Sequence, residues 1–203
     1  MKKNFSRRKI LIYAFFLSIA KTMKAETRCI ATPFQAIGPF YKEPKKKPNN
    51  DMTNNGKALG KKIKVYGQIF NKNCEPVKSA RIDIWQANSL GKYNHEKDYS
   101  QSKLDKNFYG YLRLTSDNKG KYSFISIYPG SYRVSKHIVR TPHIHFKVTT
   151  SKKLLITQMY FSDDKNNKND LLFNKTFNNN VLKAVLKKNI NKNLLSCKFN
   201  III

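Results

Sequence analysis

The sequence predicts an all-β fold, a β-sandwich of mixed short strands with long loops and at most one or two short helices. The chain has 203 residues, which suits a single domain with a substantial buried core. Many short segments alternate between apolar and polar side chains, and turn-forming residues separate them. The chain shows no strand-helix-strand rhythm and no internal repeat, which favours a sandwich over an α/β fold.

The predicted strands follow a polar loop, rich in Pro, Asn and Lys, over residues 42–60. Residues 63–70 alternate between apolar and polar side chains, and residues 71–76 form a turn before the next strand. Further strands are expected over residues 79–86, 112–115, 122–125, 131–134, 146–150, 154–161 and 198–203. Residues 163–170 are predicted to be a loop, and residues 181–188 a short helix.

Composition excludes a disordered chain, since 40% of the residues are hydrophobic and 12% aromatic. Forty Lys and Arg residues against 12 Asp and Glu residues give a net charge of +28. The lysines are scattered among many Asn and Ile residues and form no nucleic-acid-binding motif, so no specific nucleic acid is expected as a partner. The charge should still raise non-specific affinity for polyanions at low salt.

Residues 1–25 are interpreted as a signal peptide, and residues 26–203 as the folded domain. A basic start precedes a short apolar run over residues 10–20, and Ala25 offers a cleavage site. The run around Arg7 and Arg8 resembles a twin-arginine export signal, with the general secretory route as the alternative. We therefore expect a bacterial protein that is exported to the periplasm or secreted, with no stable membrane insertion after cleavage.

Three cysteines, Cys29, Cys74 and Cys197, allow one disulfide in an oxidising compartment and leave one free thiol. Cys29–Cys74 is the first expectation because both residues lie near the start of the folded part. The other pairings stay open.

His143 and His145 stand one residue apart in a run of strand-forming residues. On a strand both side chains point the same way, with Cα atoms roughly 6.5–7 Å apart, while Ile144 points into the packing. Two imidazoles so placed could share a metal ion, although a lone His-x-His is more often a polar pair on the wet face of an edge strand. Tyr93 and Tyr132 stand at strand ends or turns. A single tyrosine in such a place is more often a packing or surface residue than a metal ligand.

Several sequence blocks, taken in order, resemble the intradiol ring-cleavage dioxygenases, the non-haem ferric enzymes that include protocatechuate 3,4-dioxygenase. The resemblance covers most of the chain after the predicted signal. It is carried by residues 32–33, 38–41, 84–88, 91–95, 105–110, 122–124, 129–132, 140–146 and 157–161. Compared with that family, the loop from Tyr132 to His143 looks short, Val134 stands where an aromatic residue is common, and Thr141 replaces a frequent proline. No N-terminal helical segment of the catechol 1,2-dioxygenase kind is present, which places the chain nearer the protocatechuate branch and its exported relatives.

By matching position, the resemblance implies that Tyr93, Tyr132, His143 and His145 bind Fe(3+). The chemistry agrees, because hard ferric iron suits phenolate oxygen, and imidazole also binds iron well. The resemblance leaves His95 and His137 as non-ligands, and Trp85 is expected in the core.

The implied reaction takes a catechol-type substrate and O2 and opens the ring between the two hydroxyl-bearing carbons, giving a cis,cis-muconate-type diacid. Tyr132 is expected to leave the metal and accept a substrate proton. Arg140 would stabilise charge that develops on the ring. Gln158 is a weaker candidate for substrate binding.

Two other readings compete with this one. The charge of +28 also suits an exported, non-catalytic β-sandwich that binds surface polyanions. A zinc or ferrous site on the same histidines would lack a visible charge-transfer band. The particular catechol, the biological pathway and a homo-oligomeric state stay open.

Overall fold

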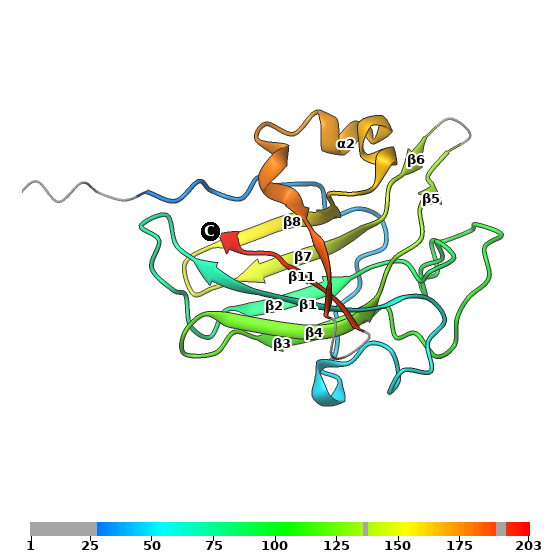
Figure 1. Cartoon of the computed structure of the whole chain (residues 1–203), viewed down its shortest axis with the longest axis horizontal. Helices are drawn as coiled ribbons and strands as arrows, with labels where there is room; N and C mark the ends of the chain where they lie inside the picture. The colour runs from blue at the N-terminus through cyan, green and yellow to red at the C-terminus, as the bar shows by residue number, and fades with distance from the viewer. Residues whose placement is uncertain (1–27, 136–137, 190–193) are drawn as a thin grey trace, which may run out of the picture.

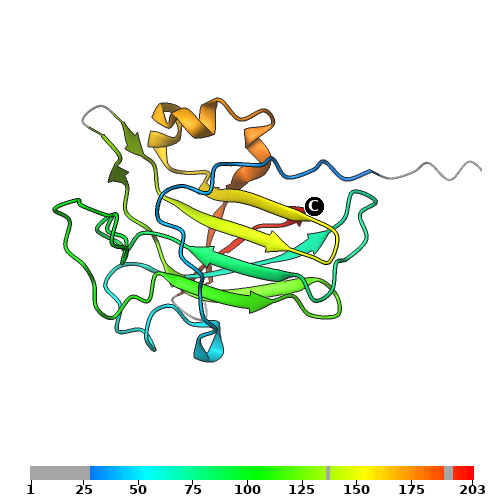
Figure 2. The same ribbon diagram turned by 180° about the vertical axis from the view of Figure 1, so that it is seen from behind.

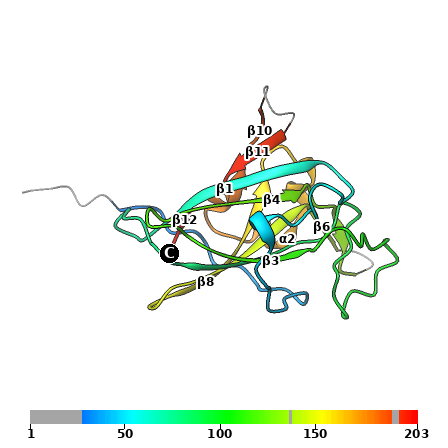
Figure 3. The same ribbon diagram turned by 90° about the horizontal axis from the view of Figure 1, so that it is seen from below.

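The computed structural model describes residues 28–135, 138–189 and 194–203. The predicted signal peptide and His137 lie outside these ranges. The described strands form two five-stranded sheets and a two-stranded hairpin. The two larger sheets pack face to face (Figures 1 and 3), which confirms the all-β sandwich. None of the helices in the described ranges has the length and apolar character needed to span a membrane.

The first sheet is built around β1, which pairs with β4 on one side and with β11 and β12 on the other. Its strands are β1 (Lys62–Phe70), β4 (Lys121–Ile127), β10 (Leu186–Asn189), β11 (Leu194–Lys198) and β12 (Ile201–Ile202). The second sheet has the order β3-β2-β7-β8-β9. Its strands are β2 (Arg81–Trp85), β3 (Tyr111–Thr115), β7 (His143–Thr149), β8 (Leu154–Phe161) and β9 (Lys183–Ala184).

The main core lies between the sheets and follows the predicted alternation. Every second residue of β1 is buried, including Ile63, Val65 and Ile69. On β7, Ile144 and Phe146 face the same core, so the histidines beside them point to the opposite face of the sheet. The strand period therefore confirms that His143 and His145 share a face.

A two-stranded hairpin, β5 (Tyr132–Arg133) and β6 (Val139–Arg140), stands beside the second sheet. In the part of the chain that the structure describes, the remaining elements are short: α2 (Leu171–Asn174) and three 3-10 helices at Pro48–Asn50, Lys165–Asn169 and Asn179–Leu182. The N-terminal segment lies along β8 (Figure 2), where Gln35 donates its backbone N–H to the carbonyl of Ile156. This segment carries Phe40 to the same end of the sheet as the histidines.

The predicted helix over residues 181–188 is wrong. The chain forms a 3-10 turn to Leu182, then β9, then β10. Leu182 and Ala184 are both buried, a spacing of two that suits a strand. As a strand, β9 pairs with the edge of β8, which a helix would leave unpaired.

Two other expectations need adjustment, and one is confirmed. The expected closing strand over residues 198–203 is divided between β11 and β12. The expected loop over residues 163–170 contains the second 3-10 helix. Cys29 and Cys74 form the expected disulfide, and Cys197 is buried and free.

Candidate metal centre

Two histidines and two tyrosines from separate parts of the chain meet at one end of the second sheet. The Nε2 atoms of His143 and His145 lie 3.1 Å apart, and the Tyr132 hydroxyl lies 3.4 Å from His143 Nε2. The Tyr93 ring packs edge-on against Tyr132, with ring centroids 5.2 Å apart. All four side chains are buried, which excludes the wet face of an edge strand. β7 also lies between β2 and β8 and is not an edge.

The His143 ring is oriented by the backbone carbonyl of Thr141, two residues earlier in the chain. Its Nδ1 lies 2.6 Å from the carbonyl oxygen of Thr141, and a carbonyl can only accept, so Nδ1 carries the proton. Nε2 therefore presents its lone pair to Tyr132 and His145. A histidine whose second nitrogen is held by a carbonyl is the usual arrangement for a metal ligand.

The His145 ring is oriented by stacking. Trp85 lies opposite His145 in the β2–β7 register, and the two rings stack at 4.7 Å with an interplanar angle of 8°. Gly38 also lies close to this ring, since a Cβ placed there would lie 3.5 Å from His145 Cε1. Trp85 is buried, as expected, but it packs directly against a candidate ligand as well.

Burial sets the protonation of all four groups. It lowers the pKa of both imidazoles well below the usual value, and the positive charge of Arg140 lowers each further. The histidines are therefore neutral, as metal ligands must be. Burial raises the pKa of Tyr93 and Tyr132, while Arg140 opposes the rise at Tyr132. Unless a metal ion binds beside them, both phenols therefore keep their protons.

The donor set fits ferric iron. The buried Tyr93 hydroxyl has no hydrogen-bond partner, although a buried hydroxyl is costly to leave unsatisfied. Within the described ranges, no group of three His, Cys, Asp or Glu side chains could hold a metal ion. Here the additional donors are tyrosines, and two phenolates with two imidazoles make a hard, anionic set suited to Fe(3+).

Arg140 lies beside this group in a buried polar network. It faces Tyr132 across the β5–β6 hairpin. Its guanidinium donates to Asp170 Oδ2 at 2.8 Å, to Gln158 Oε1 at 2.6 Å and to the Tyr160 hydroxyl at 3.1 Å. A permanent cation is thus held next to the tyrosine.

Gln158 is fully buried and occupied within the protein. Its oxygen accepts from Arg140 and Tyr160, and its Nε2 donates to the carbonyl of Ala36 at 3.1 Å. These bonds give it a direct part in holding Arg140. Its predicted contact with substrate stays a prediction.

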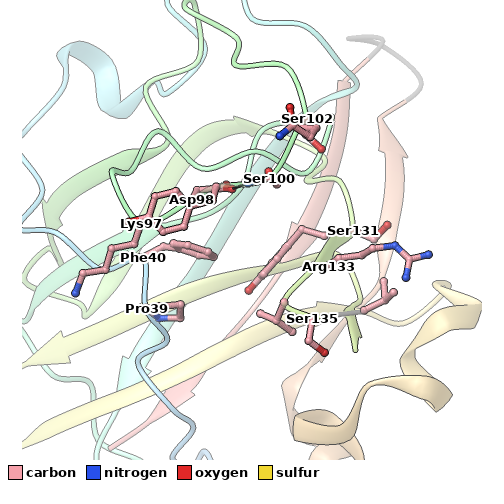
Figure 4. A pocket seen from close by; sticks show the side chains of 14 residues that line it. Pro39, Phe40, Lys97, Asp98, Ser100, Ser102, Ser131, Arg133 and Ser135 are labelled. Carbon is pink, nitrogen blue, oxygen red and sulfur yellow. Dashed lines mark hydrogen bonds between the residues drawn. The ribbon is translucent and has the colours of Figure 1, made fainter. Parts of the chain in front are cut away.

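A pocket of about 970 Å³ opens beside the group. Figure 4 shows Pro39 and Phe40 on one side of it, and Ser131, Arg133 and Ser135 on the other. Tyr132 also lines this pocket while its hydroxyl contacts His143. Tyr132 therefore stands between the open space and the histidine pair.

Sequence reasoning singled out neither Phe40 nor Asp170. Phe40 stacks on Tyr93, with ring centroids 4.4 Å apart, and meets Tyr132 edge-on at 5.8 Å. The sequence feature that could have identified Phe40 is its place in the block over residues 38–41, which resembles the family. Asp170 lies in a stretch expected to be loop, and only its position before the apolar run Leu171–Phe173 marks it, as a helix cap. His95, which was not expected to be a ligand, packs edge-on against Phe40, with ring centroids 5.9 Å apart.

The dioxygenase family pattern matches residues 36–203, which is most of the chain. The chain belongs to the intradiol ring-cleavage dioxygenase family. This family member is 39% identical over 114 residues to the protocatechuate 3,4-dioxygenase beta chain of Burkholderia cepacia, covering 54% of this chain and 48% of the relative. It is 28% identical over 160 residues to a catechol 1,2-dioxygenase of Candida albicans, covering 68% and 49%. The matches span about half the length of these relatives.

A solved structure of an intradiol ring-cleavage dioxygenase from Tetranychus urticae has the same fold. The TM-score is 0.70 at 21% identity, and the match covers 86% of this chain and 95% of that one. At this identity the likeness bears on the fold alone.

Proposed function

We propose that this chain is a ferric intradiol dioxygenase, which opens a catechol-type ring between its two hydroxyl-bearing carbons. The observation that carries the proposal is the convergence of two buried phenols and two neutral imidazoles beside an open pocket. Tyr93, Tyr132, His143 and His145 would hold the metal. Ferric iron supplies a Lewis acid that both oxygens of a catechol can chelate, and it supports the chemistry with O2. Both atoms of O2 would enter the cis,cis-muconate-type diacid, so no external reductant is required.

Tyr132 is the residue best placed to exchange with substrate. Its ring lines the pocket and its hydroxyl contacts the histidine pair, so a catechol arriving from the pocket meets it first. As a phenolate, Tyr132 would be a base within reach of an arriving catechol, and it would accept a proton from a catechol hydroxyl. Tyr132 thus links substrate binding to deprotonation.

Arg140 would stabilise negative charge on the substrate ring. It is 5% exposed, and its attachment to Asp170 and Gln158 holds it in place before the reaction begins. A preorganised cation in a site closed to water acts far more strongly than an exposed one. Phe40, which lines the pocket, and the buried Trp85, which stacks on His145, help to exclude water from the group.

The substrate belongs to the catechols, with O2 as the co-substrate. We further propose export to the periplasm or beyond, based on the basic and apolar start of the chain. The Cys29–Cys74 disulfide suits an oxidising compartment.

The test is a visible spectrum of the purified protein, with its iron content, before and after addition of a panel of catechols. We expect about one iron per chain, a tyrosinate-to-iron absorption band, a red shift on catechol addition, and O2 uptake. Tyr132→Phe should keep the fold, change the band and lose more than the about 10- to 100-fold in activity that removal of a residue behind a metal ligand typically costs. Tyr66→Phe, at an exposed tyrosine on β1, is the matched control and should behave as wild type.

A folded, colourless protein that takes up no iron would contradict the proposal. A metal-loaded protein without a visible band would instead support the zinc or ferrous reading.

A further inference from the structure

Asp170 is a fully buried carboxylate whose two oxygens have different partners. Oδ1 accepts from the backbone N–H of Phe173 at 3.0 Å and so caps α2. Oδ2 accepts from Arg140 Nε at 2.8 Å and from the backbone N–H of Thr141 at 3.1 Å. Capping needs only the first oxygen, and Asn or Ser would serve it as well. The second oxygen instead binds two residues, Arg140 and Thr141, that adjoin the candidate metal centre.

Two routes lead from Oδ2 to the centre. One passes through Arg140, whose guanidinium is oriented by the ion pair. The other passes through the Thr141 residue, whose N–H is held by Asp170 and whose carbonyl accepts from His143 Nδ1 at 2.6 Å. That second bond sets which nitrogen of His143 carries the proton. Arg140 and Thr141 are therefore both held by a residue about thirty positions further along the chain.

We propose that Asp170 is a positioning residue, which orients the Arg140 guanidinium and, through Thr141, fixes the tautomer and ring orientation of His143. Its effect on catalysis rests on the proposed function. Its effect on His143 does not, because the hydrogen bonds are present without metal.

The variant Asp170→Asn separates the two roles of this side chain. To keep capping Phe173, the amide must place its oxygen at the Oδ1 position. Its NH2 group then faces the N–H donors of Arg140 and Thr141, which cannot pair with it. Asp170→Ser is the second variant, since Ser also caps but is too short to reach Arg140.

Asp164→Asn is the matched control. Asp164 caps the neighbouring 3-10 helix by accepting from Asn166, and it accepts from the Tyr128 hydroxyl at 3.1 Å. It makes none of the bonds described for Arg140 or Thr141. If the variants acted only by loosening the segment over residues 164–174, Asp164→Asn and Asp170→Asn should change the His143 ring to the same extent.

The first measurement is the two-bond proton–nitrogen spectrum of the histidine rings in the metal-free full chain. Wild type and Asp164→Asn should show His143 protonated at Nδ1, whereas Asp170→Asn and Asp170→Ser should show a mixture of tautomers. The second is ferric ion binding, supplied as a weak chelate, which should weaken about tenfold in the Asp170 variants. In the iron-loaded enzyme, kcat should fall more than KM rises, with an altered visible band.

An unchanged His143 tautomer in a folded Asp170 variant would overturn the proposal. Equal changes in Asp164→Asn would overturn it too. If wild type binds no ferric ion, the proposed function fails, and the histidine spectrum still decides the role of Asp170.

Discussion

At the scale of single residues, the approach of Gly91 to Ser131 brings the two candidate tyrosine ligands together. Gly91 precedes Tyr93 by two residues and has φ +78°, and a Cβ there would lie 2.1 Å from the Ser131 carbonyl oxygen. Gly130 is nearly as close to this loop, since its Cβ would lie 2.4 Å from the Gly91 nitrogen. Only glycine lets the loop that carries Tyr93 lie against the segment that leads to Tyr132.

We predict that Gly91→Ala lowers the free energy of unfolding by about 3 kcal/mol or more and impairs iron uptake, because a backbone clash adds to left-handed strain. The matched control is Gly110→Ala, which has φ +72° but whose Cβ would meet the Gln86 carbonyl oxygen at an ordinary 3.6 Å. It should cost only about 1–2 kcal/mol and leave iron uptake intact. Urea unfolding and iron content measure both. Equal effects of the two variants would refute the role given to this contact.

At the scale of elements, β2 supports the histidine strand, and a buried ion pair joins β2 to β3. Asp83 lies opposite Arg113 in the register and is fully buried. It accepts from Arg113 Nε at 2.7 Å and from the Tyr41 hydroxyl at 3.0 Å. Burial and the Asp83 carboxylate raise the pKa of Tyr41 to about 12, so this donor keeps its proton at neutral pH. The pair ties the N-terminal segment and β3 to the strand next to β7.

We predict that Arg113→Met lowers the free energy of unfolding by about 3 kcal/mol, because it leaves the Asp83 carboxylate buried without its cation. This loss lies at the lower end of the range of about 3–5 kcal/mol for removing one partner of a buried ion pair, since the Arg113 side chain is 20% exposed. The control Arg81→Met changes an exposed arginine on the same strand as Asp83 and should stay within about 0.5 kcal/mol of wild type. Chemical denaturation compares them, and a loss at Arg113 no larger than at Arg81 would contradict the prediction.

At the scale of the whole molecule, the net charge of +28 dominates long-range behaviour. The Debye length, over which salt screens such charges, falls from about 30 Å at 0.01 M salt to about 8 Å at 0.15 M salt. A scattered charge should therefore attract polyanions only at low salt, and it should also draw anionic catechols towards the protein.

We predict that the protein binds immobilised heparin at about 0.01 M salt and is released by about 0.15 M salt, while catechol turnover continues. Salt-dependent elution and O2 uptake measured on the same preparation test this. Binding that survives 0.15 M salt, with no turnover of any catechol, would support the non-catalytic polyanion-binding alternative.

Local pattern was sufficient for much of the fold. Alternation in β1 predicted a strand close to the one found, because alternation reflects which side of a strand meets the core. The strand predicted over residues 154–161 has the bounds of β8, although residues 155–161 are all buried and do not alternate. The same rule placed His143 and His145 on one face. It failed near Leu182 and Ala184, where a helical and a strand reading fit almost equally well. The pairing of β9 with β8, a partner distant in the chain, decided that segment.

The sequence by itself determined the strand period, the turns, and the residue types that suit ferric iron. Only the tertiary structure decided that Tyr93 and Tyr132 meet the histidine pair, that Trp85 stacks on His145, and that Asp170 holds Arg140 and Thr141. The physical reason is the range of each interaction. Alternation and capping depend on neighbours along the chain, whereas the contacts of the centre join segments that become neighbours only when the sheets and the hairpin have packed.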